Sequence, residues 1–235
     1  MSMPWFHVLR LPAVGEVIAL DRDEAKHAVG VRRLGAGDGV TVFDGAGGIA
    51  HASLSGERDR DGGVLVRITA VERCARSGAD VVVGVAPPKG DRLSTMLDML
   101  GQLGVSAIVP LETQHGVVDA EGINRVRAAR ILLEACKQSR GAWLPELRPA
   151  ATVADFVKAA VGEGRSVLVA HPGGEPFGAL RSERSAILVG PEGGFSQAEV
   201  DAARAAGAEC VDLGAGILRV ETAAVAMAAV LRLGR

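Results

Sequence analysis

The chain has few of the residues that mark several common classes of protein. Its three cysteines, Cys74, Cys136 and Cys210, are far apart and odd in number, so neither a disulfide framework nor a zinc-binding pattern is indicated. Its five histidines show no His-Glu-x-x-His or similar spacing, and we expect no metal. No apolar run reaches the roughly 18 residues of a membrane-spanning helix, and the first residues lack the pattern of a signal peptide. These absences predict a cytoplasmic protein.

Phosphate-binding glycine loops and an excess of basic residues are also missing. No Gly-x-Gly-x-x-Gly follows a predicted strand and no Lys-Ser/Thr loop occurs, which argues against a dinucleotide-binding enzyme or a nucleoside triphosphatase of the P-loop class. The formal net charge is −2, and residues 1–76 carry ten Lys or Arg against ten Asp or Glu. Binding to nucleic acid would therefore depend on local arginine clusters.

What the chain does have is length and apolar content. With 235 residues, of which 48% are hydrophobic, it can form one large domain or a small and a medium domain. Residues 1–74 show short apolar runs separated by glycine turns, which favour a small β-barrel with one short helix at 23–34, capped by Asp21 or Asp23. The strands that we expect there are 8–11, 17–20, 40–43, 49–54 and 64–71.

The remainder of the chain alternates between strand and helix patterns. Residues 75–80 are small and polar and predict a linker. From residue 81 the alternation favours an α/β fold with a mostly parallel sheet. The last helix, 221–233, has almost no polar face, so we expect it in a core or against a second subunit. The other segments expected after the linker are strands 81–86, 105–110, 167–170, 185–189 and 209–213 and helices 93–103, 122–139 and 153–162.

Two glycine-rich turns near the C-terminus are the candidate ligand site. The segments 190–194 and 213–219 each follow a predicted buried strand and precede a helix. Ser196 and Glu199 fit a capping box for the first of these helices, and Gly207 fits its end. Loops at the carboxyl ends of adjacent parallel strands are where open α/β sheets bind ligands. Glycines there let backbone groups approach a ligand closely.

These two turns also resemble a known family. The segments GPEGGFS (190–196), LGAGILR (213–219) and VETAA (220–224) are similar to the signature of the RsmE family, the 16S ribosomal RNA (uracil-N3)-methyltransferases of the SPOUT class. Residues 89–92, 103–110 and 134–145 also resemble segments of the family. Two places differ: residues 114–116 lack the family's usual Arg-Ser pair, and Gly216 stands where many relatives have arginine. The resemblance implies a PUA-like RNA-binding domain at 1–74, a linker at 75–80 and a SPOUT domain with a C-terminal trefoil knot at 81–235. It also implies S-adenosylmethionine as cofactor, 16S rRNA or the 30S subunit as partner, and a homodimer.

The resemblance assigns roles to particular residues. Arg219 is the first candidate for stabilising negative charge on the uracil, although it could instead pair structurally with Glu221 or Glu192. Glu192 is a candidate base, but a carboxylate in a tight glycine turn more often accepts local backbone N–H groups. The cofactor-binding residues implied are Ala170, His171, Pro172, Gly190, Pro191, Glu192, Gly193, Gly194, Leu213, Gly214, Ile217, Leu218, Arg219, Thr222 and Ala223.

The RNA contacts implied are mostly arginines. Arg32 and Arg33 form a pair in the β-rich part, where a phosphate contact and a solvated surface are about equally favoured. The full set of RNA-binding candidates is Arg10, Arg32, Arg33, Lys89, Arg92, Gln138 and Arg140.

Two other functions stay open at this stage. One is a ribose 2′-O-methyltransferase of the same fold, although the asparagine-centred motif of such enzymes is not obvious. The other is a non-catalytic RNA-binding or ribosome-assembly factor, against which the intact 190–194 and 217–222 motifs argue.

Overall fold

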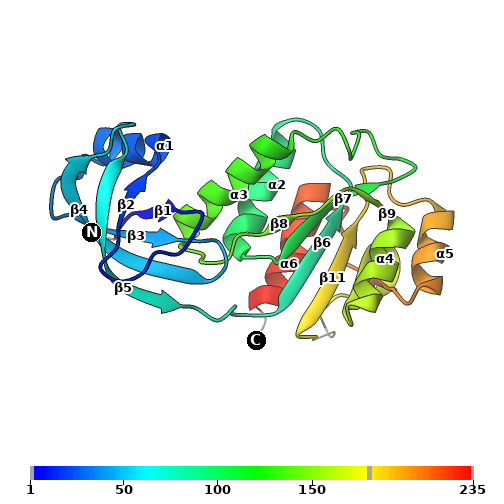
Figure 1. Ribbon diagram of the computed structural model, residues 1–235. Coiled ribbons are helices and arrows are strands. Elements are labelled where there is room, and N and C mark those ends of the chain that lie inside the picture. The colour runs from blue at the N-terminus through cyan, green and yellow to red at the C-terminus, as the bar shows by residue number, and fades with distance from the viewer. Residues whose placement is uncertain (1–2, 179–181, 234–235) are drawn as a thin grey trace. The chain divides into compact units, whose positions relative to one another are not determined.

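The computed structural model describes residues 3–178 and 182–233 (Figure 1). The chain divides into two compact units. The first contains residues 1–76 and the later segment 136–144, and the second contains residues 77–135 and 145–235. The second unit carries both glycine-rich turns.

The first unit is built on a five-stranded sheet. Its strand order is β1-β3-β4-β5-β2, with β1 and β3 parallel and the other neighbours antiparallel. Apolar side chains from all five strands, among them Phe6, Val42 and Val66, form one buried core. The strands are β1 (Trp5–His7), β2 (Val17–Leu20), β3 (Gly39–Phe43), β4 (Gly48–Arg58) and β5 (Val64–Arg73).

Two predictions for this unit need correction. The expected strand at 8–11 is wrong: the first strand is Trp5–His7, because Phe6 is fully buried there whereas Leu9 is 97% exposed. The expected helix at 23–34 is shorter and irregular, comprising α1 (Arg22–Ala25) and the π-helical turn η1 (Lys26–Val31). Its predicted cap is confirmed, since the Asp21 side chain accepts from the Glu24 backbone N–H at 2.8 Å.

The segment 136–144 is attached to the first unit by Trp143. The Trp143 indole N–H donates to the Cys74 carbonyl at 3.1 Å, and the Arg76 guanidinium lies 4.7 Å from the ring centroid. A Cβ on Gly47 would come within 2.4 Å of the same ring, so only glycine fits beneath it. Burial raises the pKa of the Cys136 thiol to about 12, which keeps this cysteine protonated and unreactive.

The second unit is built on a parallel sheet. Six strands follow the order β12-β10-β11-β6-β7-β8, and β9 pairs with β7 beside them. The mostly parallel α/β architecture is therefore confirmed. The strands are β6 (Asp80–Val85), β7 (Ala107–Glu112), β8 (Glu146–Leu147), β9 (Ala151–Thr152), β10 (Ser166–Pro176), β11 (Arg184–Val189) and β12 (Glu209–Asp212).

Helices cover both faces of this sheet (Figure 1). Because side chains alternate along a strand, Ala107 and Val109 of β7 pack against Phe156 of α4, whereas Ile108 points toward α2 and α3. The helix α6 packs on α2, β6 and β11. The helices are α2 (Asp91–Leu103), α3 (Arg125–Ser139), α4 (Val153–Gly162), α5 (Gln197–Ala205) and α6 (Val220–Leu233).

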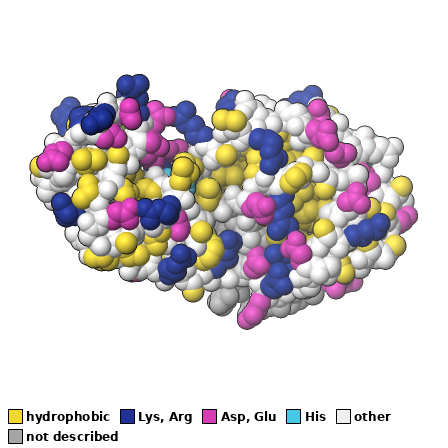
Figure 2. Space-filling view, in the orientation of Figure 1, with side chains coloured by type: hydrophobic (Ala, Val, Ile, Leu, Met, Phe, Trp, Pro, Cys, Tyr) yellow, Lys and Arg dark blue, Asp and Glu magenta, His cyan; other side chains and the backbone are white. Residues whose placement is uncertain are grey.

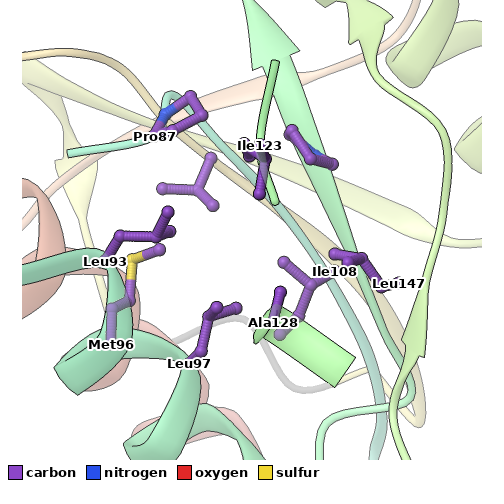
Figure 3. Close-up of a pocket in the computed structure, with 10 residues that line it drawn as sticks. Pro87, Leu93, Met96, Leu97, Ile108, Ile123, Ala128 and Leu147 are labelled. Carbon is purple, nitrogen blue, oxygen red and sulfur yellow. The ribbon is translucent and has the colours of Figure 1, made fainter. Parts of the chain in front are cut away.

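The core between β6, β7, α2 and α3 leaves one small void. Leu93, Met96 and Leu97 of α2 face Ile108 of β7 and Ala128 of α3 across it (Figure 3). The void measures about 10 Å³ and has an entirely apolar lining, which is at the lower limit for a single water molecule. It is a gap in the packing of the core rather than a ligand site.

The helix ends follow the sequence signals. The capping box of Ser196 and Glu199 is confirmed, and Gly104 ends α2 in the left-handed conformation. The expected helix 122–139 begins only at Arg125, because the Asn124 side chain accepts from the Arg127 N–H at 3.0 Å. The strands β8 and β9 have two residues each, too few to produce a periodic pattern.

Within residues 3–178 and 182–233, no helix is long and apolar enough to cross a membrane. No group of three or more His, Cys, Asp or Glu side chains in the same residues is arranged to hold a metal ion.

Candidate active site

Three loops meet at the carboxyl edge of the parallel sheet. The two glycine turns follow β11 and β12, and the strand between them is β10. The two strands that precede the glycine turns, β11 and β12, were expected to be adjacent. This is wrong, because β10 lies between them and contributes a third loop to the site. A bulge in β10 between Ala170 and Glu175 turns His171 and Pro172 out of the regular ladder beside β12. Parallel strands place all three loops at the same edge of the sheet.

These loops surround the candidate pocket, a cavity of about 630 Å³. Ligand sites for molecules the size of a cofactor measure about 300–1,000 Å³. Most of the lining is backbone and small side chains, so main-chain N–H and C=O groups are available to a ligand. The lining residues are Ala170, His171, Pro172, Val189, Gly190, Pro191, Glu192, Gly193, Gly194, Phe195, Asp212, Leu213, Gly214, Ala215, Gly216, Ile217, Leu218, Val220 and Ala223.

Most of the cofactor-binding candidates from the sequence thus lie around one cavity. Arg219 and Thr222 are not part of its lining, and both are exposed. Phe195 and Asp212 line it although neither was predicted to do so. The structure brings these candidates together, while their part in binding stays a prediction.

Asp212 connects two of the three loops. Its carboxylate accepts from the Gly173 N–H at 3.0 Å and from the Gly214 N–H at 2.8 Å. These backbone donors, first Gly173 and then Gly214, hold the pKa of Asp212 below its usual value. An aspartate directly before a glycine-rich turn often accepts from backbone N–H groups two residues later. That signal was present in the sequence, but the bond to Gly173 depends on the strand pairing.

The first glycine turn is closed by one of its own backbone bonds, and its glutamate is held from outside. Gly194 has φ 71° and donates to the Pro191 carbonyl at 2.8 Å, closing the turn. The Glu192 carboxylate pairs with the Arg92 guanidinium at 2.8 Å, with both side chains about one third exposed. No backbone N–H donates to Glu192 among the described residues. The prediction that local amides hold Glu192 is therefore wrong, and the first turn of α2 supplies its partner.

Arg219 is left available at the end of the second glycine turn. Within the part of the chain that the structure describes, Arg219 forms no ion pair, so the alternative pairing with Glu192 or Glu221 is not observed. Its carbonyl accepts from the Ala223 N–H at 2.9 Å at the start of α6. The backbone is thus fixed while the guanidinium is exposed.

His171 presents an unusual polar atom at the pocket. Its Nδ1 is buried and has no hydrogen-bond partner within the described residues. His171 is one of the cofactor-binding candidates from the sequence. A buried polar atom without a partner costs free energy, and this one belongs to a residue that lines the pocket.

The RNA-binding candidates fall into both units. Arg10, Arg32, Arg33, Gln138 and Arg140 belong to the first unit, and Lys89 and Arg92 belong to the second. Arg10 pairs with Glu16, and Arg32 lies 3.5 Å from a His27 ring nitrogen. Arg33 and Arg140 adopt φ values of 57° and 58°, which are uncommon for residues other than glycine.

Charge on the first unit is mixed. Figure 2 shows Lys and Arg side chains interspersed with Asp and Glu on the face in view. The segment 136–144 adds Lys137 and Arg140 and no acidic residue to a stretch that is balanced on its own. The first unit is therefore slightly more basic than residues 1–76 predicted.

Comparison with known proteins defines the class first. The family model of the RNA methyltransferase domain matches residues 75–232, and that of the RNA methyltransferase PUA domain matches residues 20–66. The chain thus has the domains of an RNA methyltransferase with a PUA domain.

Individual relatives then specify the family. "Ribosomal RNA small subunit methyltransferase E" of Mycobacterium bovis is 30% identical over 96% of this chain and 90% of its own, and that of Rickettsia conorii is 30% identical over 92% and 89%. The Neisseria gonorrhoeae enzyme of the same name, solved bound to S-adenosyl methionine, has a TM-score of 0.87 at 26% identity, covering 97% of this chain and 96% of that one. The chain belongs to the ribosomal RNA small subunit methyltransferase E family.

Proposed function

We propose that the protein transfers a methyl group from S-adenosylmethionine to N3 of a uridine in the 16S rRNA of the small ribosomal subunit. The observation that carries the proposal is the convergence of three loops on one pocket in a chain of this family. A structure of the Legionella pneumophila putative methyltransferase, solved in complex with the cofactor, supports the choice of cofactor with a TM-score of 0.88 at 26% identity, covering 100% of this chain and 98% of that one.

The residues of the pocket fit this cofactor. Its lining includes the carboxylate of Asp212, which accepts from backbone N–H groups, and, of the residues the structure describes, no lysine or arginine. Such a lining suits a ligand that carries a sulfonium and an ammonium group. The glycine turns present backbone polar groups, and His171 Nδ1 supplies a partnerless buried atom. The other backbone contacts would come from the segments 170–172, 190–194 and 213–218.

The bound cofactor supplies an electrophilic methyl group, and the protein has to align the uracil and stabilise the charge that develops on it. Uracil N3 carries a weakly acidic proton, and its loss places negative charge on the carbonyl oxygens. Arg219, exposed and free of an ion pair within the described residues, donates to one of these oxygens. Glu192 is occupied by Arg92, so it shapes the loop. The N3 proton passes to solvent, and no single general base is indispensable.

The uridine has to be presented unpaired, because N3 lies on the Watson–Crick edge of the base. We assign this presentation to the PUA-like domain at 1–74, joined by the linker 75–80 to the catalytic domain at 81–235. Arg10, Arg32 and Arg33 with Gln138 and Arg140 would contact the RNA backbone in the first unit, and Lys89 and Arg92 in the second. A substrate of this kind is consistent with the cytoplasmic location expected from the sequence.

A trefoil knot and a homodimer complete the proposal. The chain runs from β11 past β10 to β12, and α6 then returns to pack on β11 and β6, a path compatible with a threaded C-terminus. The side of α6 away from the sheet exposes Val230 and Leu233, which a second copy of the chain would cover.

The test is incubation with unmodified 30S particles, with free 16S rRNA and with labelled cofactor, followed by mass spectrometry of the nucleosides. Recovery of 3-methyluridine supports the proposal. Ribose methylation would assign the chain to the 2′-O-methyltransferases instead. Cofactor binding too weak to detect by calorimetry, with RNA binding retained, would point to a non-catalytic assembly factor.

A further inference from the structure

The turn 113–116, which follows β7, is attached to the start of α5. The Gly116 N–H donates to the Thr113 carbonyl at 3.0 Å and closes the turn. The Gln114 N–H donates to Glu199 Oε1 at 2.8 Å, and Glu199 Oε2 accepts from the Ser196 backbone N–H at 2.7 Å. A single carboxylate thus joins this turn to the capping box that directly follows the first glycine turn.

His115 is the residue of this turn that contacts the glycines themselves. Its Nδ1 lies 3.2 Å from the Gly194 carbonyl oxygen. A Cβ built on Gly193 would lie 3.1 Å from the His115 Cβ, so the two segments are already in close contact. Because a carbonyl oxygen only accepts, the Nδ1 of His115 carries the hydrogen in this bond.

The contact is transmitted to the pocket through one peptide unit. The Gly194 carbonyl belongs to the peptide that leads into Phe195. The Phe195 ring and backbone nitrogen lie 3.1–3.2 Å from the position that a Cβ on Gly190 would take. Phe195 and Gly190 both line the pocket. The hydrogen bond to the Gly194 carbonyl therefore fixes the peptide plane that leads into Phe195, and with it the position of Phe195 beside Gly190 in the pocket lining.

We propose that His115 is a positioning residue that preorganises the cofactor pocket by donating from Nδ1 to the Gly194 carbonyl. The inference rests on the proposed function, because it assigns to S-adenosylmethionine the pocket that His115 shapes. His115 is not among the residues that line the pocket, and its influence passes through Gly194 and Phe195. A preorganised wall lowers the ordering cost of binding, so loss of the bond weakens cofactor affinity while the chemical step is retained.

The test compares three substitutions of His115 that differ in where they place a donor. In His115→Asn the side-chain amide N–H₂ lies near the position of Nδ1, in His115→Gln the amide lies further out, and in His115→Leu no donor remains. Val117→Ala is the matched control, since Val117 is exposed and lies two residues further along the same loop. The measurements are the Kd for S-adenosylmethionine by calorimetry, and kcat and KM for the cofactor with 30S particles.

The expected result is a Kd and a KM for the cofactor raised about fivefold in His115→Leu and His115→Gln, with kcat changed by less than about twofold. His115→Asn should restore both constants to within about twofold of the wild type, as should Val117→Ala. Equal weakening in the Asn and Gln variants, or wild-type affinity in His115→Leu, would overturn the proposal. If His115→Leu fails to fold, the comparison of Asn with Gln decides alone. A wild-type protein that does not bind the cofactor would instead refute the proposed function.

Discussion

The two glycine turns share one pocket, but they are held in opposite ways. The first turn, 190–194, is contacted by Arg92 at the start of α2 and by His115 in the loop after β7. In the second, residues 214–219 are all exposed, and the side chain of Ile217 is fully so. At its start, the Gly214 N–H donates to the Asp212 carboxylate. Similar sequence patterns therefore produce one turn that is held by side chains from other segments, called the rigid turn below, and one that is exposed, called the open turn.

The difference indicates what each turn meets. A wall that is already ordered reduces the entropy lost when a small ligand binds. An exposed turn that carries an apolar and a cationic side chain, Ile217 and Arg219, has surface available to a macromolecule. Under the proposed function the first turn serves mainly the cofactor, and the second serves the rRNA or the partner subunit.

The largest effect is expected from Arg219→Ala in the open turn. Removing one donor that stabilises developing negative charge lowers kcat by about 10²–10³. Since Arg219 has no ion pair among the described residues, the melting temperature and the cofactor Kd should stay unchanged. Single-turnover kinetics with 30S particles measures the loss, and Arg219→Lys, which keeps the charge, serves as control. A kcat equal to that of the wild type would remove Arg219 from the chemical step.

A smaller effect is expected from Asp212→Ala, which separates the open turn from the β10 bulge. Both backbone bonds of the carboxylate are lost, and we expect the cofactor Kd to rise about tenfold. Calorimetry with Asp212→Asn, which keeps one acceptor, provides the intermediate case.

The stability difference between the wild type and Asp212→Ala should also depend on pH. Because the folded-state pKa of Asp212 is lowered from its usual 3.8, its stabilisation is present above that value and is lost as the pH falls through the lowered pKa. The difference in melting temperature between wild type and variant should therefore close below a pH of about 4. A difference that persists at lower pH would mean that another effect of the substitution dominates.

Glu192→Gln tests the rigid turn and should act more weakly. The ion pair with Arg92 is partly exposed, and such pairs contribute about 0.2–1 kcal/mol. We expect the cofactor KM to rise about two- to fivefold and kcat to stay within about tenfold. A double-mutant cycle with Arg92→Met isolates the pair. Abolished turnover in a folded Glu192→Gln protein with intact cofactor affinity would show that Glu192 is an indispensable base.

The smallest effect is expected from Gly216→Arg, which adds charge to the open turn. A Cβ on Gly216 meets no atom within 4 Å, and its φ lies outside the left-handed region, so folding should be unaffected. Affinity for 16S rRNA should increase a few-fold, and the slope of log K against log salt should steepen by about one. Filter binding over a salt series measures both. An unchanged slope would place residue 216 away from RNA phosphates.

Local signals predicted much of the second unit. The capping box at Ser196 and the end of α2 at Gly104 are confirmed, because such signals act within a few residues.

In the first unit the strand predicted at 8–11 was wrong. Its residues are apolar and fit a strand locally, but the burial of Phe6 and not Leu9 depends on pairing with β3. The pairing of a strand with a distant segment does not show in the hydrophobic pattern of the few residues that form the strand.

The same limit applies to the site. The glycine turns were visible as motifs, but the partners of Glu192, Gly194 and Asp212 come from residues 92, 115 and 173. Each of these contacts joins segments separated by roughly 40 or more residues along the chain. Sequence spacing cannot show which loop will reach which turn.

The sequence by itself determined the mostly parallel sheet through periodicity and caps, and its glycine motifs carried the resemblance to the family and to its cofactor-binding segments, because all of these are local properties of the chain. Only the tertiary structure decided that β10 lies between β11 and β12, that residues 136–144 belong with the first unit, and that Arg92 and His115 hold one glycine turn while the other stays exposed. The physical reason is that these features arise from packing between distant segments, where burial and backbone hydrogen bonding are satisfied together.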